Sequence, residues 1–327
     1  MPHTAPQAEL PYNDVLKRLV VHHVTVYRYK NPVKFNEHRL MFRPRDSHDL
    51  RLVGWGLTIS PKARVLWHHD VFGNSIATAY FSQPAAELVF ECMLVVDHYG
   101  MRDSEPFIEP FAENLPFTYP ADELPDLGRT MERHYPDPER RIDAWARQSL
   151  SRSGIHNTMN VLLKMTRAVK EQFTYVRRTE PGVQTPLETL DRGAGTCRDF
   201  ALFMMEAGRS LGLASRFVSG YLYDPAVDNP AGHMLSGGGS THAWVEFYIP
   251  GAGWLEFDPT NGLLGGVNLL RVAVARDPHQ AIPLRGSYFG LAEDFIDMKV
   301  NVNVTSQPLL AARVPGSTVS HDVSTAP

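Results

Sequence analysis

Three residues of the chain have the side chains that catalysis by a thiol requires: Cys197, His242 and Asp258. A thiolate attacks a carbonyl carbon, an imidazole carries the proton, and a carboxylate fixes the imidazole tautomer. Cys197 follows the turn 193–196 and begins an amphipathic helix. The free N–H groups and the positive end of the helix dipole favour the thiolate there, so we expect a thiol pKa below about 8.5. The same amides supply one donor for an oxyanion.

A predicted β-hairpin brings His242 towards Asp258. The alternating segments 242–249 and 254–258 flank the turn 250–253. Folding about this turn sets position 242 near position 258, and their even separation puts both side chains on one face. A slip of one residue would place them on opposite faces. The alternative interpretation is an ordinary strand histidine, with Asp258 opening the Asp-Pro-Thr-Asn-Gly turn.

The segments around these residues predict two domains. Short alternating segments between positions 20 and 97 are typical of strands in a small β-sandwich; they are 23–29, 38–44, 55–61, 76–81 and 87–96. Cys92 lies inside the last of them, which indicates a small buried hydrophobic residue. Prolines then punctuate the stretch 100–138, which we interpret as a linker that wraps around the domains without folding.

Helical patterns follow the linker. Helices are expected over 139–150 and 158–173, a Thr-Pro-Leu-Glu capping box starts another at Thr185, and Gly212 ends the helix that begins at Cys197. The expected division of the chain is as follows: a flexible N-terminus (1–19), a β-sandwich domain (20–98), a Pro-rich linker (99–138), a catalytic domain (139–305) and a disordered tail (306–327).

Composition limits the class of protein. The chain has 327 residues, 43% of them hydrophobic, and a formal net charge of -4, a profile typical of a soluble globular protein and one that gives no reason to expect nucleic acid or membrane as a partner. Two cysteines exclude a disulfide framework, and no apolar run is long enough for a signal peptide or a membrane span. We therefore expect a cytoplasmic protein. The pair His22-His23 and the run 68–70 lack zinc-module spacing, so no metal is predicted.

The sequence then resembles a known family. The segments GAGTCRDFALFMMEAGRSLGLASRFVSGYL (193–222), THAWVEFYIPGAGWLEFDPTNG (241–262) and RVAVARDPHQAIPLRGSYFG (271–290) are similar to bacterial transglutaminase-like proteins, some of which are regarded as cysteine proteases. The opening region, with HHVTVYRYKNPVKFNEHRLMFRPR (22–45), resembles the β-domain that accompanies them.

The resemblance implies an α+β fold of the papain type, in which a helix carrying the nucleophile packs against an antiparallel sheet. By position it makes Cys197 the nucleophile, His242 the general acid and base, and Asp258 its orienting partner. The implied chemistry is attack on an amide to form a thioester, then transfer to water or an amine. Animal relatives depend on calcium, but no EF-hand type of loop occurs here, and we predict neither metal nor cofactor.

Three functions remain as hypotheses. The first is a peptidase- or amidase-like hydrolase of a peptide or isopeptide substrate, the second an acyl transferase that uses an amine, and the third a non-catalytic peptide-binding scaffold. The N-terminal domain could bind a protein partner. Tyr175 is a weak candidate for the second oxyanion donor, with core packing as the alternative. The glycine run 237–239 is either a flap over the cleft or a solvated loop.

Overall fold

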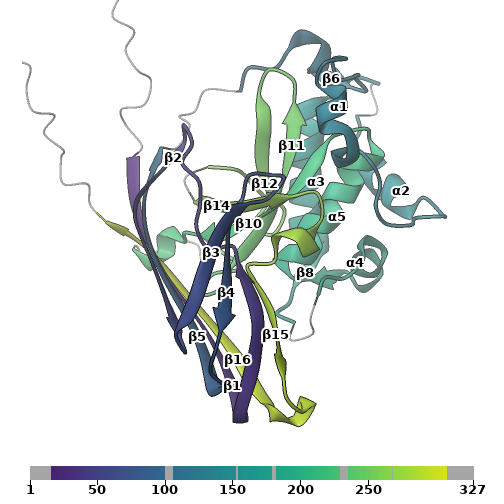
Figure 1. The fold of residues 1–327 in the computed structure, drawn as a ribbon. Coiled ribbons are helices and arrows are strands. Elements are labelled where there is room, and N and C mark those ends of the chain that lie inside the picture. The colour runs from purple at the N-terminus through teal and green to yellow at the C-terminus, as the bar shows by residue number, and fades with distance from the viewer. Residues whose placement is uncertain are drawn as a thin grey trace, which may run out of the picture.

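The structure, a computed structural model, describes residues 16–99, 106–151, 154–178, 182–228, 235–266 and 268–307. It contains a β-sandwich and a second unit in which a five-stranded antiparallel sheet carries helices on one face. Figure 1 shows the helices gathered on the side of this sheet that lies away from the sandwich. The predicted α+β fold, in which helices pack against an antiparallel sheet and an all-β domain accompanies them, is confirmed.

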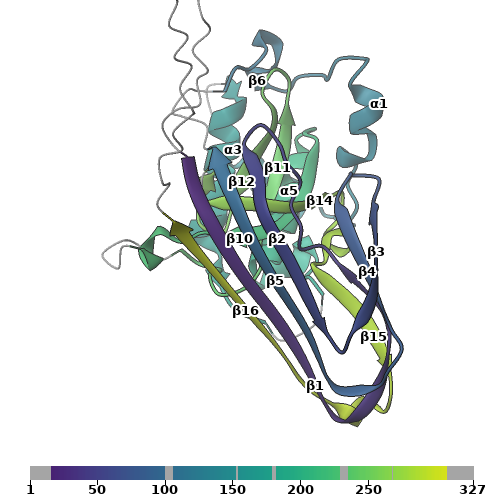
Figure 2. The ribbon, with the colours of Figure 1, turned by 60° about the vertical axis from the view of Figure 1, so that its left-hand side comes forward.

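The sandwich is organised by β1 (Leu16–Leu40), a single strand of 25 residues that contributes to both layers. Its first part pairs with β5 and β16, and its last part pairs with β4 and β15. The register shifts between Arg28 and Val33, where the strand passes from one layer to the other. Figure 2 shows the long strands of the first layer running side by side. The other strands of this unit are β2 (Leu50–Ser60), β3 (Ala63–His69), β4 (Ser75–Phe81), β5 (Ala85–Tyr99), β15 (Leu284–Phe289) and β16 (Phe295–Gln307).

Two strands of the sandwich come from the far end of the chain, which corrects the predicted domain boundaries. Residues 284–305 were assigned to the catalytic domain, but β15 and β16 pair with β1 on its two halves. Pairing between such distant segments leaves no local trace in a sequence. Strand β3 was not predicted either, and β1 merges two predicted strands into one. Leu16–Leu19, expected to be flexible, belong to β1, and the rest of both predicted flexible termini lies outside the described residues except for the end of β16.

The second sheet has the strand order β13-β12-β11-β10-β14. These strands are β10 (Ser215–Leu222), β11 (His242–Ile249), β12 (Gly253–Asp258), β13 (Leu263–Leu264) and β14 (Leu269–Ala275). Alternation sorts β11 into two faces: Val245 and Phe247 lie in the core beneath the helices, whereas Trp244 lies in a small cluster on the opposite face. Tyr221 and Leu270 of this sheet share a hydrophobic core with the sandwich.

The predicted helices are confirmed within a few residues. They are α2 (Arg141–Arg147), α3 (Thr158–Gln172), α4 (Pro186–Arg192) and α5 (Cys197–Ser210). Thr185 and Glu188 form the expected capping box of α4, which pairs two backbone N–H groups that would otherwise lack partners. Gly212, with φ of 86°, follows the end of α5 in the left-handed conformation that glycine adopts without strain. Among the described residues, no helix is long and apolar enough to cross a membrane.

The segment predicted as a linker packs onto the second unit wherever it is described. It forms short elements, and β6 pairs with β7 in front of α3. Tyr119 is buried, donates a hydrogen bond to the carbonyl of Tyr248 over 3.0 Å and accepts one from the N–H of Ala214 over 2.9 Å. The short elements of this segment are Pro110–Ala112 (a 3-10 turn), β6 (Asn114–Leu115), α1 (Leu124–Leu127) and Gly128–Thr130 (a 3-10 turn), and β7 (His156–Asn157) lies outside it, directly before α3.

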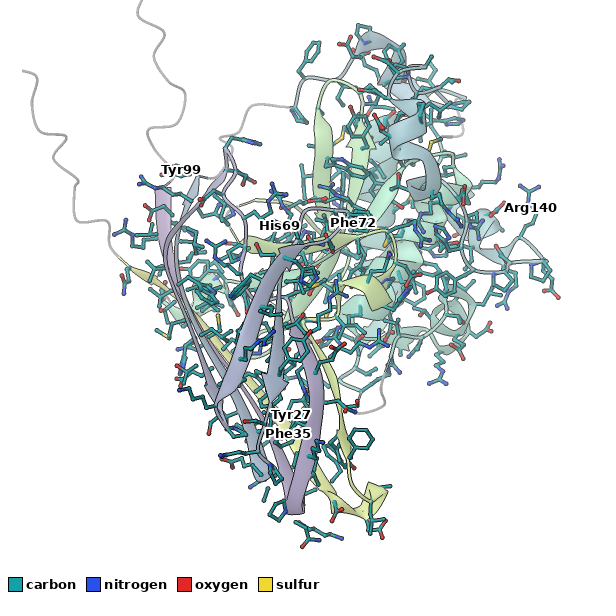
Figure 3. All side chains as sticks on the ribbon, in the orientation of Figure 1. Tyr27, Phe35, His69, Phe72, Tyr99 and Arg140 are labelled. Carbon is teal, nitrogen blue, oxygen red and sulfur yellow. The ribbon has the colours of Figure 1, made fainter. Side chains whose placement is uncertain are left out.

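Specific polar contacts fix the sandwich against the second unit. Asn74, at the turn between β3 and β4, exchanges two hydrogen bonds with the backbone of Val274 in β14, at 2.7 and 2.9 Å. Phe72 of the same turn packs against the catalytic core, and Figure 3 shows it at the junction, whereas Tyr27 and Phe35 lie at the far end of the sandwich. These contacts hold β14, and through it the five-stranded sheet, in a fixed position relative to the sandwich.

Candidate active site

Cys197 is the first residue of α5, as the sequence predicts. The chain is held just before it, because β9 (Ala194–Gly195) pairs in parallel with β8 (Thr174–Tyr175). Gly195 has no room for a side chain: a Cβ atom there would lie 2.9 Å from the Cβ of Asp199 and 3.2 Å from the ring of Phe200. This tight approach fixes the position of the backbone directly before Cys197.

Asp199 organises the start of α5. Its side chain is fully buried and accepts hydrogen bonds from the N–H of Thr196 (2.7 Å), the hydroxyl of Thr196 (2.9 Å) and the N–H of Gln184 (2.7 Å). Arg178 donates to both carboxylate oxygens, at 3.1 and 3.0 Å. The sequence suggested only a favourable charge at the helix start. The carboxylate also ties the nucleophile turn to two neighbouring segments.

His242 and Asp258 meet as the hairpin predicts. The register pairs Val245 with Phe257, which sets Trp244 opposite Asp258 and His242 two residues away on the same face. Nε2 of His242 lies 2.9 Å from Oδ2 of Asp258, and both side chains are buried. Because a carboxylate only accepts here, Nε2 carries the proton that it shares with Asp258, and Nδ1 is left free in the neutral ring.

The turn after β12 holds the Asp258 carboxylate in place. Oδ1 accepts the N–H groups of Thr260 and Asn261, at 2.9 and 3.3 Å. Oδ2 accepts the side-chain amide of Asn261 at 2.7 Å in addition to His242. Burial raises the pKa of Asp258, but the charge of His242 and these hydrogen bonds outweigh it and lower the pKa below its ordinary value. Asn261 was not predicted as a site residue, although the Asp-Pro-Thr-Asn-Gly turn was the available signal.

Cys197 and His242 perturb each other's protonation. Burial is the largest influence on the Cys197 thiol and raises its pKa, but interaction with His242 and the charge of Arg198 reverse the sign, so the pKa is lowered. Burial lowers the pKa of His242, whereas Asp258 and Cys197 raise it to about 10. The two shifts together favour a thiolate beside an imidazolium at neutral pH. Cys92, by contrast, is buried among apolar side chains, and its pKa is raised to about 12.

The three side chains are covered in this structure. Cys197 is 6% exposed and His242 1%, and Nδ1 of His242 is buried without a hydrogen-bond partner among the described residues. Gly237 lies directly above that nitrogen: a Cβ atom there would stand 2.6 Å from Nδ1. We call the residues 235–241 the cover loop. Of the two interpretations of its glycine run, the flap agrees with this position.

Hydrogen bonds from several elements hold the cover loop. Asn261 accepts from the N–H of Ser236 (2.8 Å) and donates to its carbonyl (3.2 Å), so one side chain anchors both the loop and Asp258. The N–H of Val302 in β16 donates to the carbonyl of Gly239 over 3.2 Å. Two arginines also contact the loop: Arg177 donates to the carbonyl of Gly238 (2.9 Å), and Arg198 donates to the hydroxyl of Thr241 (3.3 Å).

Tyr175 lies beside the nucleophile. Its strand pairs Tyr175 with Gly195, two residues before Cys197. Burial raises its pKa to about 12, and the charge of Cys197 contributes to the shift. The ring packs edge-on to Phe200, with centroids 6.4 Å apart, while the hydroxyl makes no hydrogen bond to any residue that the structure describes. Both predicted roles therefore remain compatible with its position: core packing by the ring and hydrogen-bond donation by the hydroxyl.

The geometry supports covalent chemistry by a thiol. A thiolate at a helix N-terminus can attack a carbonyl carbon, and the first amides of the helix can bind the oxyanion that forms. The imidazolium beside it can protonate a leaving amine. Within the described ranges, no group of three or more His, Cys, Asp or Glu side chains is placed to hold a metal ion.

Family models match both units. Residues 19–97 match the bacterial transglutaminase-like N-terminal region, and residues 146–259 match the transglutaminase-like superfamily. An uncharacterized protein of Mycobacterium tuberculosis is 30% identical over 297 residues, which are 87% of this chain and 92% of that protein. A protein-glutamine gamma-glutamyltransferase of Pseudomonas aeruginosa is 39% identical over 71 residues, which are 21% of this chain and 10% of that enzyme.

A solved structure shares the fold of both units. A protein of Cytophaga hutchinsonii, provisionally described as a cysteine protease, superposes with a TM-score of 0.66 at 18% sequence identity. The match covers 90% of this chain and 92% of that one, so the sandwich and the catalytic unit are present together in both proteins. With its two family regions and relatives that match along almost their whole length, this chain belongs to the bacterial transglutaminase-like family.

Proposed function

We propose that this chain is a cysteine-dependent enzyme that cleaves an amide bond of a peptide or isopeptide-type substrate through a thioester intermediate. The observation that supports it most is the joint placement of a thiol with lowered pKa, a histidine with raised pKa and a carboxylate 2.9 Å from that histidine. Cys197 is the nucleophile, His242 the proton carrier and Asp258 the residue that orients His242.

The proposed reaction has two steps. The Cys197 thiolate bonds to the amide carbon, the carbon–nitrogen bond breaks, and the amine leaves with the proton from Nδ1 of His242. Water then gives a proton back to His242 and attacks the thioester carbon, which releases the acid and restores the thiolate. Throughout, Asp258 accepts from Nε2 and stabilises the imidazolium.

Transfer of the acyl group to an amine is the second candidate. The observation that favours it is the similarity to a protein-glutamine gamma-glutamyltransferase over 71 residues. The triad chemistry is the same in both cases, because only the acceptor of the thioester differs. A cytoplasmic location is also proposed, supported by two free cysteines, both of them buried.

The proposal is tested by the pH dependence of iodoacetamide labelling at Cys197, followed by mass spectrometry so that Cys92 serves as an internal control. We expect wild-type Cys197 to react as a thiolate well below pH 8.5, His242→Ala to return the reaction to the range of an ordinary thiol, and Cys92 to remain unlabelled. An ordinary thiol profile in the wild type that both His242→Ala and Asp258→Ala leave unchanged would refute the catalytic assembly.

Activity then separates the two candidates. Amide libraries are incubated with the enzyme with and without added primary amine, and Cys197→Ser provides the blank. Release of free acid at the same rate in both conditions supports hydrolysis, whereas products that carry the added amine support transfer.

A further inference from the structure

Two arginines near the nucleophile lack an anionic partner among the described residues. Arg177 and Arg198 form no ion pair with any carboxylate in the part of the chain that the structure describes. Arg178, the residue after Arg177, differs from Arg177 and Arg198 because it forms an ion pair with the buried Asp199. Cations beside an active thiol that are not used to hold the fold are available to a ligand.

Both guanidinium groups are placed near the reacting sulfur. Arg198 follows Cys197 directly, and its charge helps to lower the pKa of the thiol. Arg177 stands two residues after Tyr175, and the charges of Arg177, Arg198 and Cys197 all act on the Tyr175 hydroxyl. Both cations contact the part of the cover loop, 238–241, that joins Gly237 to His242.

The arginines now bind only neutral acceptors, and both acceptors belong to the cover loop. Arg177 donates to the carbonyl of Gly238 and Arg198 to the hydroxyl of Thr241, at 2.9 and 3.3 Å. A carboxylate carries the opposite charge and can accept two parallel hydrogen bonds from a guanidinium group, which a single carbonyl or hydroxyl oxygen cannot do. A ligand with a carboxylate would therefore compete successfully with the loop for these donors.

We propose that Arg177 and Arg198 bind a carboxylate on the acyl part of the substrate, so that the scissile amide belongs to an acidic acyl group such as a γ-glutamyl or β-aspartyl group. This rests on the proposed amide-cleaving function and names its substrate class. The same contact removes two hydrogen bonds from the cover loop. Substrate binding and uncovering of Cys197 are therefore coupled through the same two side chains.

The two arginines also offset the repulsion between the thiolate and a carboxylate. A carboxylate beside a thiolate is repelled, so a free thiolate reacts poorly with an anionic reagent. Two neighbouring guanidinium groups reverse that preference. The preference can be measured without knowledge of the natural substrate, because iodoacetate and iodoacetamide have nearly the same size and differ in charge. In both reactions the sulfur–carbon bond forms, the carbon–iodine bond breaks and iodide leaves.

The experiment compares the two second-order rate constants for Cys197 in the full chain, with glutathione as the free-thiol reference. The ratio of iodoacetate to iodoacetamide cancels the thiolate fraction, and it retains any opening of the cover loop that the carboxylate of iodoacetate causes. We expect the ratio to exceed that of glutathione at least about tenfold, and Arg177→Gln and Arg198→Gln each to lower it about fivefold or more. Arg192→Gln, which removes an exposed cation that forms no ion pair among the described residues, is the matched control and leaves the ratio unchanged.

A protection experiment identifies the anion. Glutarate is expected to slow iodoacetamide labelling of the wild type but not of Arg177→Gln, whereas the uncharged glutaramide protects neither. A ratio equal to that of glutathione, or protection by inorganic phosphate without protection by glutarate, would overturn the carboxylate assignment. The pH profile with iodoacetamide separates the two proposals: a low thiol pKa with no anion preference refutes only the substrate class, and an ordinary pKa with a high ratio refutes only the catalytic assembly.

Discussion

Gly237 lies so close to His242 that a Cβ atom on its backbone would stand 2.6 Å from Nδ1, the ring nitrogen that has no hydrogen-bond partner among the described residues. The backbone of Gly237 has φ of 100°, a conformation that side chains with a Cβ rarely adopt. The cover loop therefore closes over the imidazole only because this position carries no side chain.

Gly237→Ala is expected to open the cover loop. The left-handed backbone and the contact with the ring together cost on the order of 1 kcal/mol or more, which raises the population of the open loop about fivefold or more. A bulky aryl disulfide reagent should then reach Cys197 faster by that factor, while the thermal unfolding midpoint barely changes. Gly238→Ala is the matched control, because a Cβ there meets nothing within 4 Å. Equal labelling rates in the two variants would contradict the covering role of Gly237.

Asp258→Asn is expected to dismantle the ion pair between Cys197 and His242. Oδ1 must keep accepting the N–H groups of Thr260 and Asn261, so the new NH₂ group faces Nε2 as a second donor. The pKa of His242, raised to about 10 chiefly by Asp258 against burial, then falls, and burial raises the pKa of the Cys197 thiol. Labelling by iodoacetamide at pH 6 should drop on the order of 10²-fold or more and recover only at alkaline pH. A wild-type profile in this variant would show that Asp258 does not govern His242.

Asp199→Ala tests the anchoring of the nucleophile turn. The substitution leaves the Arg178 guanidinium and the Gln184 N–H without their buried acceptor. We expect a loss of about 3–5 kcal/mol in the free energy of unfolding, measured by urea denaturation. Asp191→Ala is the control, since that exposed aspartate also pairs with an arginine, Arg141, yet exposed pairs contribute about 1 kcal/mol or less. Similar losses in the two variants would contradict the anchoring role.

Glu256 makes the stability of the chain depend on pH. Burial, and then the charge of Glu246, raise its pKa from 4.5 to about 8, and Arg271 offsets only part of this. A raised pKa means that the folded state binds the proton more tightly, so this contribution to stability is complete below pH 4.5 and is lost as the pH rises towards 8. Glu256→Gln should therefore gain stability relative to the wild type between pH 5 and pH 9, measured by denaturant unfolding at each pH. A difference between the two proteins that is constant with pH would rule out this titration.

Local patterns in the sequence predicted the elements that carry Cys197, His242 and Asp258. The capping box at Thr185, the turn before Cys197 and the hairpin that ends at Asp258 are each specified by neighbouring residues, and the even spacing of His242 and Asp258 fixes their common face. The structure brings together the three residues that were predicted, whose catalytic roles remain to be tested by the labelling experiment.

What the sequence did not reveal depends on distant segments. Three contacts join segments that no local pattern relates. They are the pairing of β16 with β1, the hydrogen bond between Asn261 and Ser236, and the hydrogen bond between Arg177 and Gly238. Asn261 lies in the Asp-Pro-Thr-Asn-Gly turn, but its two roles emerge only when the cover loop is folded back onto it. Side-chain contacts of this kind are set by tertiary packing, not by periodicity.

The pairing of β1 with β16 has a consequence for the synthesis of the protein. On the ribosome, β1 can pair with β5 as soon as the first hundred residues have emerged, but its other edge stays open until the final strand leaves the exit tunnel. The carbonyl of Gly239 also has no donor until that strand is in place, because it accepts its hydrogen bond from the N–H of Val302. Until β16 emerges, the nascent chain therefore has an exposed sheet edge and a cover loop that lacks this hydrogen bond, and the pairing of β16 with β1 supplies both.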